Sequence, residues 1–180
     1  DILQMTVNTK DVNKYLIKIQ QGDTSYMEPL FNDTANHLLA VAKFYLVNKS
    51  LAEDVVSTSF INVLQYIHSF DPKQSGYNWL CKIVQNTAQT FNSKEQKIYI
   101  AQGKSVADQP TEYYDNSFNA NLDFDDILRL LKGTDQIIAF RRFYLDETLE
   151  QIGEKLDISR AAVSNRVKNI AKITKKSQNK

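Results

Sequence analysis

The sequence predicts an all-α protein made of two small helical domains joined by a flexible acidic linker. Apolar residues recur at the spacing of a helix over most of residues 9–100, and again beyond residue 123. Only five glycines and three prolines occur among the 180 residues, which argues against a turn-rich β fold. The stretch between the periodic regions is acidic and rich in asparagine, as linkers often are. We therefore expect domains at residues 9–100 and 123–176, with a linker at residues 101–122.

Four consecutive helices are expected in the first domain, with breaks near residues 21–23, 48–50 and 70–76. The last break contains both proline and glycine, so residues 70–76 are predicted to form a loop. Ser50 is the expected N-cap of the third helix, because Glu53 follows it at the spacing of a capping box.

The second domain is expected to begin with two helices, at residues 124–131 and 135–144. Three residues, Lys132, Gly133 and Thr134, separate them. Gly133 fits the end of the first helix, because glycine adopts the left-handed conformation that often follows a helix. Thr134 is the expected N-cap of the second helix.

Charge is distributed unevenly along the chain, although the net charge is only +1. Residues 101–126 contain one basic and six acidic residues, whereas residues 158–180 contain seven basic residues and no acidic one. A basic segment on an otherwise neutral protein is typical of proteins that bind a polyanion such as nucleic acid. The alternative is a helix end that is simply solvated.

No catalytic site, metal site or cofactor is expected. His37 and His68 have no Asp, Glu or Cys neighbours at the spacing of metal ligands, and no glycine-rich phosphate loop occurs. Glu53 and Asp54 are adjacent, so on a helix they point apart and cannot form a facing carboxylate pair. The single cysteine, Cys81, excludes a disulfide within the chain. We therefore expect a protein that is not an enzyme.

A cytoplasmic location is expected for a chain with a single cysteine, and two further features agree with it. No run of about 18 apolar residues occurs, so no membrane-spanning helix or membrane association is predicted. The N-terminus lacks a charged segment followed by an apolar stretch, so no signal peptide is predicted.

Residues 149–167 have the features of a helix-turn-helix. Gly153 leaves room where the second helix crosses the first. Asp157 can adopt the positive φ that the turn needs, and Ser159 is a suitable N-cap for the second helix. Apolar residues then occur where the two helices would share a core: Ile152, Leu156, Ile158, Val163 and Val167.

The second helix of this motif would present a polar face to the major groove of DNA. Arginine can bond guanine there, asparagine can bond adenine, and alanine can contact the thymine methyl group. Lysines further along the helix would contact phosphates. The alternative is an ordinary helical hairpin. The residues expected to bind DNA are Ser159, Arg160, Ala161, Ser164, Asn165, Arg166, Lys168 and Lys172.

The chain resembles the extracytoplasmic-function sigma factors at two separate places. The segments Glu150–Gly153 and Val163–Val167 resemble the domain of that family that binds the −35 promoter element. The segment Leu51–Val56, followed by Phe60, resembles the helix by which the family binds RNA polymerase. Phe70-Asp71-Pro72 and the segment Trp79–Ala88 resemble its −10 element loop and the helix after it.

This resemblance implies a first domain of the sigma region 2 type and a second of the region 4 type, and it implies specific contacts. The protein would bind core RNA polymerase, through its β′ and β subunits, and promoter DNA, and an anti-sigma factor is a further expected partner. The implied polymerase-binding residues are Glu53, Asp54, Ser57 and Phe60.

A base flipped out of the −10 strand needs an apolar surface and hydrogen-bonding groups. The residues implied there are Phe70, Asp71, Ser75, Asn78 and Asn86.

The function expected from these features is that of a sigma factor that directs promoter-specific transcription initiation. Two other interpretations remain open. One is a transcription regulator that uses the same helix-turn-helix without joining RNA polymerase. The other is a partner-binding module that no longer recognises promoters.

The basic C-terminal segment leads to a first testable prediction. Replacing Lys175 and Lys176 with alanine should weaken DNA binding on every sequence and flatten its salt dependence, because phosphate contacts release counterions without reading bases. A salt titration of DNA affinity measures both effects. Unchanged affinity would mean that the basic segment is merely solvated.

Overall fold

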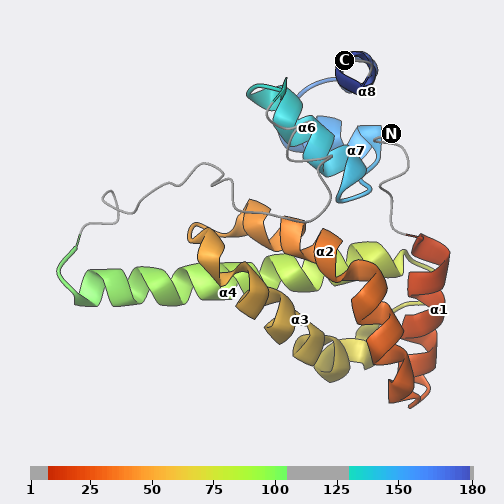
Figure 1. The fold of residues 1–180 in the computed structure, drawn as a ribbon, viewed down its shortest axis with the longest axis vertical. Helices are drawn as coiled ribbons and strands as arrows, with labels where there is room; N and C mark the ends of the chain where they lie inside the picture. The colour runs from red at the N-terminus through yellow and green to blue at the C-terminus, as the bar shows by residue number, and fades with distance from the viewer. Residues whose placement is uncertain (1–7, 105–129, 179–180) are drawn as a thin grey trace. The chain divides into compact units, whose positions relative to one another are not determined.

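The computed structural model describes residues 8–104 and 130–178, and within these ranges every regular element is helical (Figure 1). The predicted all-α fold is confirmed. The described residues divide into two compact units, one within Val7–Ser117 and the other within Phe118–Lys180. The expected acidic linker beyond residue 104 and all but the end of the helix expected at residues 124–131 lie outside the described residues.

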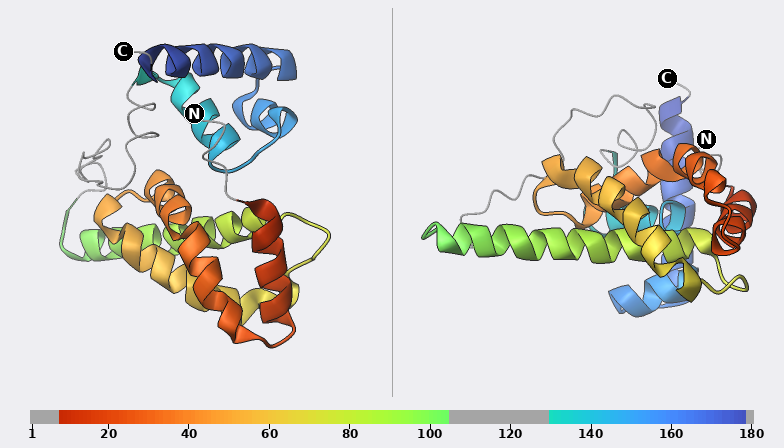
Figure 2. Two further views of the ribbon diagram at one scale, coloured as in Figure 1. Left: turned by 45° about the vertical axis from the view of Figure 1, so that its right-hand side comes forward. Right: turned by 90° about the horizontal axis from the view of Figure 1, so that it is seen from below.

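The N-terminal unit is a bundle in which the longest helix packs against the other three (Figure 2). Its side chains bury a continuous apolar core, which includes Leu16, Leu30, Leu38, Val55 and Leu80 at 1% exposure or less. Burial of such side chains is the main stabilising contribution to a bundle of this size. The helices are α1 (Thr9–Gln20), α2 (Met27–Tyr45), α3 (Ala52–Tyr66) and α4 (Gly76–Ala101), with 3-10 turns η2 (Thr24–Tyr26), η3 (Lys49–Leu51) and η4 (Ile67–Ser69).

The start of α3 differs from the prediction. Ser50 does not cap the helix, because it lies inside the 3-10 turn η3 that precedes α3. Asn48 caps this turn instead, since its side-chain oxygen accepts hydrogen bonds from the backbone N–H (3.2 Å) and the hydroxyl (2.7 Å) of Ser50. The Ser50–Glu53 spacing is local and did not show that a 3-10 turn capped by Asn48 would precede α3.

The start of α4 also differs, since Gly76 is the first helical residue and not part of the loop. Ser75 caps the helix by accepting a hydrogen bond from the N–H of Asn78 at 3.3 Å. Gly76 is buried against α1: a Cβ atom there would lie 2.6 Å from Cδ1 of Leu16. A glycine at this position therefore allows α4 to begin in close contact with α1.

The C-terminal unit contains α6 (Thr134–Phe143), α7 (Leu149–Leu156) and α8 (Arg160–Gln178), and α8 packs against both of the other helices. Its fully buried side chains include Ile138, Phe140, Ile152, Val163 and Ile170. Thr134 is not the cap of α6, contrary to the prediction, because it is already helical. Gly133 precedes it with a φ of +54° and occupies the N-cap position.

Glu147, in the segment between α6 and α7, connects these two helices. Its carboxylate accepts hydrogen bonds from Nη1 of Arg141 in α6 at 3.1 and 3.2 Å, and it forms an ion pair with Lys155 in α7. The side chains of Glu147 and Arg141 are only 11% and 17% exposed, so the pair is poorly screened by solvent. These contacts orient α7 relative to α6 before the helix-turn-helix begins.

Candidate nucleic-acid interface

The first helix of the helix-turn-helix, α7, begins at a capping box that the sequence analysis missed. The hydroxyl of Thr148 accepts a hydrogen bond from the N–H of Gln151 at 3.2 Å, and the side chain of Gln151 accepts one from the N–H of Thr148 at 2.8 Å. The signal was present in the sequence, because threonine followed three residues later by glutamine is the spacing of this motif.

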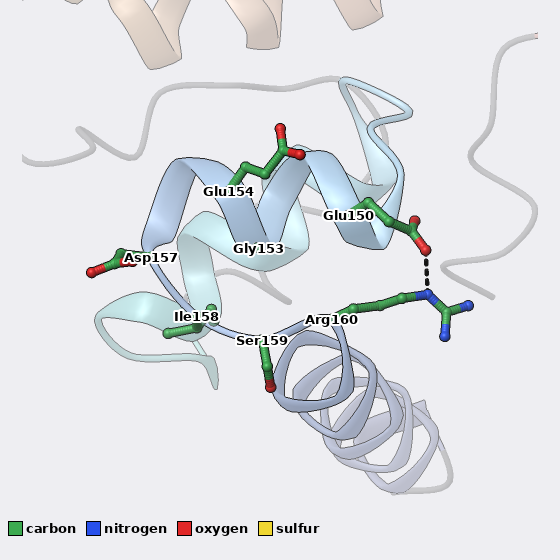
Figure 3. Close-up of a pocket in the computed structure, with 7 residues that line it drawn as sticks. All are labelled: Glu150, Gly153, Glu154, Asp157, Ile158, Ser159 and Arg160. Carbon is green, nitrogen blue, oxygen red and sulfur yellow. Dashed lines mark ion pairs between the residues drawn. The ribbon is translucent and has the colours of Figure 1, made fainter.

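The turn between α7 and α8 has the predicted geometry. Asp157 adopts a left-handed conformation with φ 53° and ψ 44°, and the carbonyl of Gly153 accepts a hydrogen bond from the N–H of Ile158 at 3.0 Å. The backbone of the turn lies directly against Gly153 (Figure 3). A Cβ atom on Gly153 would lie 2.6 Å from the carbonyl oxygen of Ile158. The prediction that a residue without a side chain is needed here is confirmed.

The second helix, α8, begins as predicted at Ser159. The hydroxyl of Ser159 accepts a hydrogen bond from the N–H of Ala162 at 3.2 Å, which is the expected N-cap bond. Val163 and Ile170 on one side of α8 are fully buried, and Thr174 is also buried, whereas Val167 is only half-buried. The inner face of this helix is therefore close to the one predicted.

The outer face of α8 is polar and basic. It presents no acidic side chain from Arg160 to Thr174. Among the residues predicted to bind DNA, Ser164 is half-buried and the others on this helix are exposed: Arg160, Ala161, Asn165, Arg166, Lys168 and Lys172. Asn169, which was not predicted, is exposed as well. Lys175 and Lys176 continue the helix, but their side chains lie outside the part that the structure describes.

Arg160 forms an ion pair with Glu150 of α7 (Figure 3). The contact uses Nε of the guanidinium, and Figure 3 shows the two terminal nitrogens pointing away from Glu150. The backbone N–H of Glu150 lowers the pKa of its carboxyl, and the hydrogen bond from Arg160 lowers this pKa further. Glu150 therefore stays ionised at neutral pH, and the ion pair is lost only as the pH falls through the lowered pKa.

Arg166 is directed differently from the other predicted DNA-binding residues. Its Nη1 donates to the carboxylate of Asp135 in α6 at 2.7 Å, and its side chain is 45% exposed. This ion pair joins α8 to α6. The structure thus gives Arg166 a partner within the C-terminal unit, which the sequence analysis did not anticipate.

A shallow depression lies where α7, the turn and α8 meet (Figure 3). It has a volume of about 440 Å³ and is open to solvent. Three carboxylates, those of Glu150, Glu154 and Asp157, are among its lining groups. Phosphate does not fit this acidic surface, so the basic outer face of α8 is the better candidate for DNA contact.

In the N-terminal unit, the loop 71–75 follows a buried aromatic anchor. Phe70 is 3% exposed and its ring packs against Trp79, with centroids 5.4 Å apart and the planes inclined by 53°. Phe70 is therefore part of the core in this conformation and presents no ring face to a flipped base. The other residues predicted for the −10 element are exposed, namely Asp71, Asn78 and Asn86, or half-buried, namely Ser75.

The face of α3 predicted to bind polymerase is partly exposed. Glu53, Asp54 and Ser57 are exposed, whereas Phe60 is 8% exposed and packs against Phe31 with ring centroids 4.9 Å apart. Two further apolar residues of α3 are exposed, Ile61 at 67% and Leu64 at 45%. They lie one turn apart on α3 and together form a small exposed apolar patch, which the sequence analysis did not include in this face.

Comparison with known protein families identifies the N-terminal unit. Residues 30–98 match the model of the family described as sigma-70 region 2. The chain carries a sigma-70 region 2 domain. This domain comprises most of α2, all of α3 and α4 as far as residue 98, whereas α1 precedes it and the C-terminal unit lies beyond it. The resemblance to sigma factors is confirmed.

A similar fold occurs among solved structures. The chain is similar to CnrH, solved in complex with the cytosolic domain of CnrY, with 14% identity, a TM-score of 0.50, and coverage of 93% of this chain and 96% of that chain. It is also similar to the sigma factor RpoE from Bartonella quintana, solved in complex with the anti-sigma factor NepR. That match has 17% identity, a TM-score of 0.46, and coverage of 88% and 96%. No relative was found among curated proteins.

In residues 8–104 and 130–178 no group of three or more His, Cys, Asp or Glu residues could hold a metal ion. No helix in the same ranges is long and apolar enough to span a membrane.

The contact at Gly153 leads to a testable prediction. Gly153→Ala should destabilise the C-terminal unit by roughly 1–3 kcal/mol, because the added Cβ must displace backbone of the turn. Alanine favours a helix by up to about 1 kcal/mol relative to glycine, so a net loss means that the close contact dominates. Hydrogen exchange of the backbone amides in residues 149–174 measures the change.

Glu154→Ala is the matched control for this prediction, because Glu154 is the exposed neighbour of Gly153 in α7. It should change stability by no more than about 0.5 kcal/mol. Trp79 is the only tryptophan and lies in the N-terminal unit, so its fluorescence should stay the same in both variants. Wild-type exchange rates in Gly153→Ala would contradict the proposed crossing contact.

Proposed function

We propose that this protein is a sigma factor of the extracytoplasmic-function type, which directs transcription initiation by binding core RNA polymerase and the −10 and −35 promoter elements. The observation that carries the proposal is the combination of two parts in one chain. Residues 30–98 are a sigma-70 region 2 domain, and the second unit has a helix-turn-helix whose outer face is basic and exposed. A sigma factor needs both a polymerase contact and a promoter contact.

Recognition of the −35 duplex would use the outer face of α8 in the major groove. The terminal nitrogens of Arg160 suit the O6 and N7 acceptors of guanine, and the exposed amide of Asn165 suits adenine. Glu150 favours the outward orientation of Arg160 because it pairs with Nε. Lys168 and Lys172 would contact phosphates, which add affinity without sequence information.

The N-terminal unit would bind polymerase and the melted −10 element. The exposed residues Glu53, Asp54 and Ser57 of α3 would contact the β′ subunit, and Ile61 and Leu64 would extend this face with apolar area. A base that is flipped out of the strand, unlike a base read in the duplex, needs exposed polar groups and a stable pocket. Asp71, Asn78 and Asn86 are exposed and would supply the polar groups for such a base.

The buried position of Phe70 changes how the −10 contact is proposed. Phe70 would support the loop from the core of the bundle and would not stack on the base itself.

An anti-sigma factor that covers the polymerase-binding or promoter-binding surfaces is part of the same proposal. A cytoplasmic location is also part of it, because core polymerase and promoter DNA are found there.

Reconstitution with core polymerase tests the proposed function. The purified chain is added to core RNA polymerase with fragments of genomic DNA from its source, and the 5′ ends of new transcripts are mapped. A sigma factor yields transcripts that start at defined positions and depend on the added chain. A regulator binds DNA but gives no initiation with core enzyme alone, and a partner-binding module gives neither result.

Replacing Asn165 tests the assignment of the base-reading face. Asn165→Ala should lower discrimination at one base pair of the −35 element by about 1–3 kcal/mol, because a bidentate contact with a base is lost. Affinity for core polymerase should not change. The measurement compares binding to the mapped promoter and to its single-base variants.

Lys172→Ala is the contrasting variant, because its exposed side chain lies further along the same helix. It should weaken binding to all sequences alike and reduce the slope of the salt dependence by about one. If Asn165→Ala behaved in the same way as Lys172→Ala, base reading would have to be assigned to another face.

A further inference from the structure

The loop 71–75 is held at its first end by one side chain of α1. Nε2 of Gln20 donates hydrogen bonds to the carbonyl of Ile67 at 3.0 Å and to the carbonyl of Phe70 at 2.9 Å. Both carbonyls belong to the segment that leads from α3 into the loop. Gln20 is partly buried, so these bonds are partly shielded from competing water.

The same helix holds the other end of the loop. Nδ2 of Asn13 donates to the carbonyl of Gln74 at 2.9 Å, and Oδ1 of Asn13 accepts from the N–H of Gly76 at 2.6 Å. Asn13 and Gln20 are seven residues apart, which places them on the same side of α1 two turns from each other. Leu16 lies between them and faces Gly76. One face of α1 therefore contacts both ends of the loop.

Inside the loop, the hydrogen bonds are local and leave the side chains outside. The carboxylate of Asp71 accepts from the N–H of Lys73 at 3.0 Å, and the carbonyl of Asp71 accepts from the N–H of Gln74 at 2.9 Å. The four residues 71–74 are all exposed. The loop thus has a defined backbone and an open surface, a combination that lowers the entropy lost when a ligand binds.

We propose that Asn13 and Gln20 are positioning residues for recognition of the melted −10 strand. They do not contact DNA; they hold the loop 71–75 in the conformation that receives an unpaired base. This inference rests on the proposed function. It assigns a role to α1, which lies outside residues 30–98 and so receives none from the region 2 match.

The experiment uses holoenzyme assembled from core polymerase and the full chain. The probe is a set of single-stranded DNA oligonucleotides selected by the wild-type holoenzyme from a randomised pool. Gln20→Met removes two hydrogen bonds to the loop with little change in volume, and Asn13→Leu removes the other two. Each variant should lower oligonucleotide affinity on the order of 10-fold, while affinity for core polymerase stays at the wild-type value.

Two further variants separate positioning from a general structural effect. Gln21→Met removes an exposed amide from the end of the same helix and should leave both affinities unchanged. Asn13→Asp keeps the acceptor for Gly76 but cannot donate to Gln74, so its loss should be smaller than that of Asn13→Leu. Hydrogen exchange at the amides of Lys73 and Gln74 should accelerate in Gln20→Met and Asn13→Leu.

The outcomes distinguish this inference from the proposed function. If wild-type holoenzyme selected no oligonucleotide, the proposed function and this inference would both fall. If it selected oligonucleotides that Gln20→Met and Asn13→Leu bound equally well, only the role of α1 would be overturned. A parallel loss of affinity for core polymerase would also overturn it, because the two amides would then support the bundle as a whole.

Discussion

The backbone contact between Gly153 and the turn after α7 is the constraint on which the C-terminal unit depends. The carbonyl of Ile158 approaches the Cα of Gly153 so closely that a Cβ would lie 2.6 Å from it. This approach sets how steeply α8 crosses α7. The crossing in turn decides which side of α8 is buried at Val163 and Ile170, and which side carries Arg160 and Asn165 into solvent.

Electrostatic pairs then set the direction of individual side chains on this frame. Glu147 joins α6 to α7 through Arg141 and Lys155 in a poorly exposed position, where ionic contacts are least screened. Two exposed pairs involve α8. Glu150 pairs with Arg160 and Asp135 pairs with Arg166, and exposed pairs of this kind contribute little to stability. Each pair engages one nitrogen of an arginine and so restricts the conformations of that side chain.

In the N-terminal unit, side chains of another helix hold the loop 71–75 in position. The loop 71–75 contains no large buried side chain of its own. Its backbone is held by the buried Phe70, which precedes it, and by the amide side chains of Asn13 and Gln20 in α1. Amide side chains suit this role because each both donates and accepts, and so can satisfy backbone groups of either kind. In both units, the positions of exposed side chains and loops depend on contacts with another helix of the same unit.

The sequence by itself determined the helical pattern, the turn at Asp157, the cap at Ser159 and the need for glycine at residue 153. These features depend on the residues within a few positions of each other, where backbone conformation and local hydrogen bonds are decided. Only the tertiary structure decided that Phe70 is buried, that Arg166 pairs with Asp135, and that Asn13 and Gln20 hold a loop more than 45 residues away. Such contacts join helices that are distant in sequence. No local spacing encodes them, because they depend on how the helices pack.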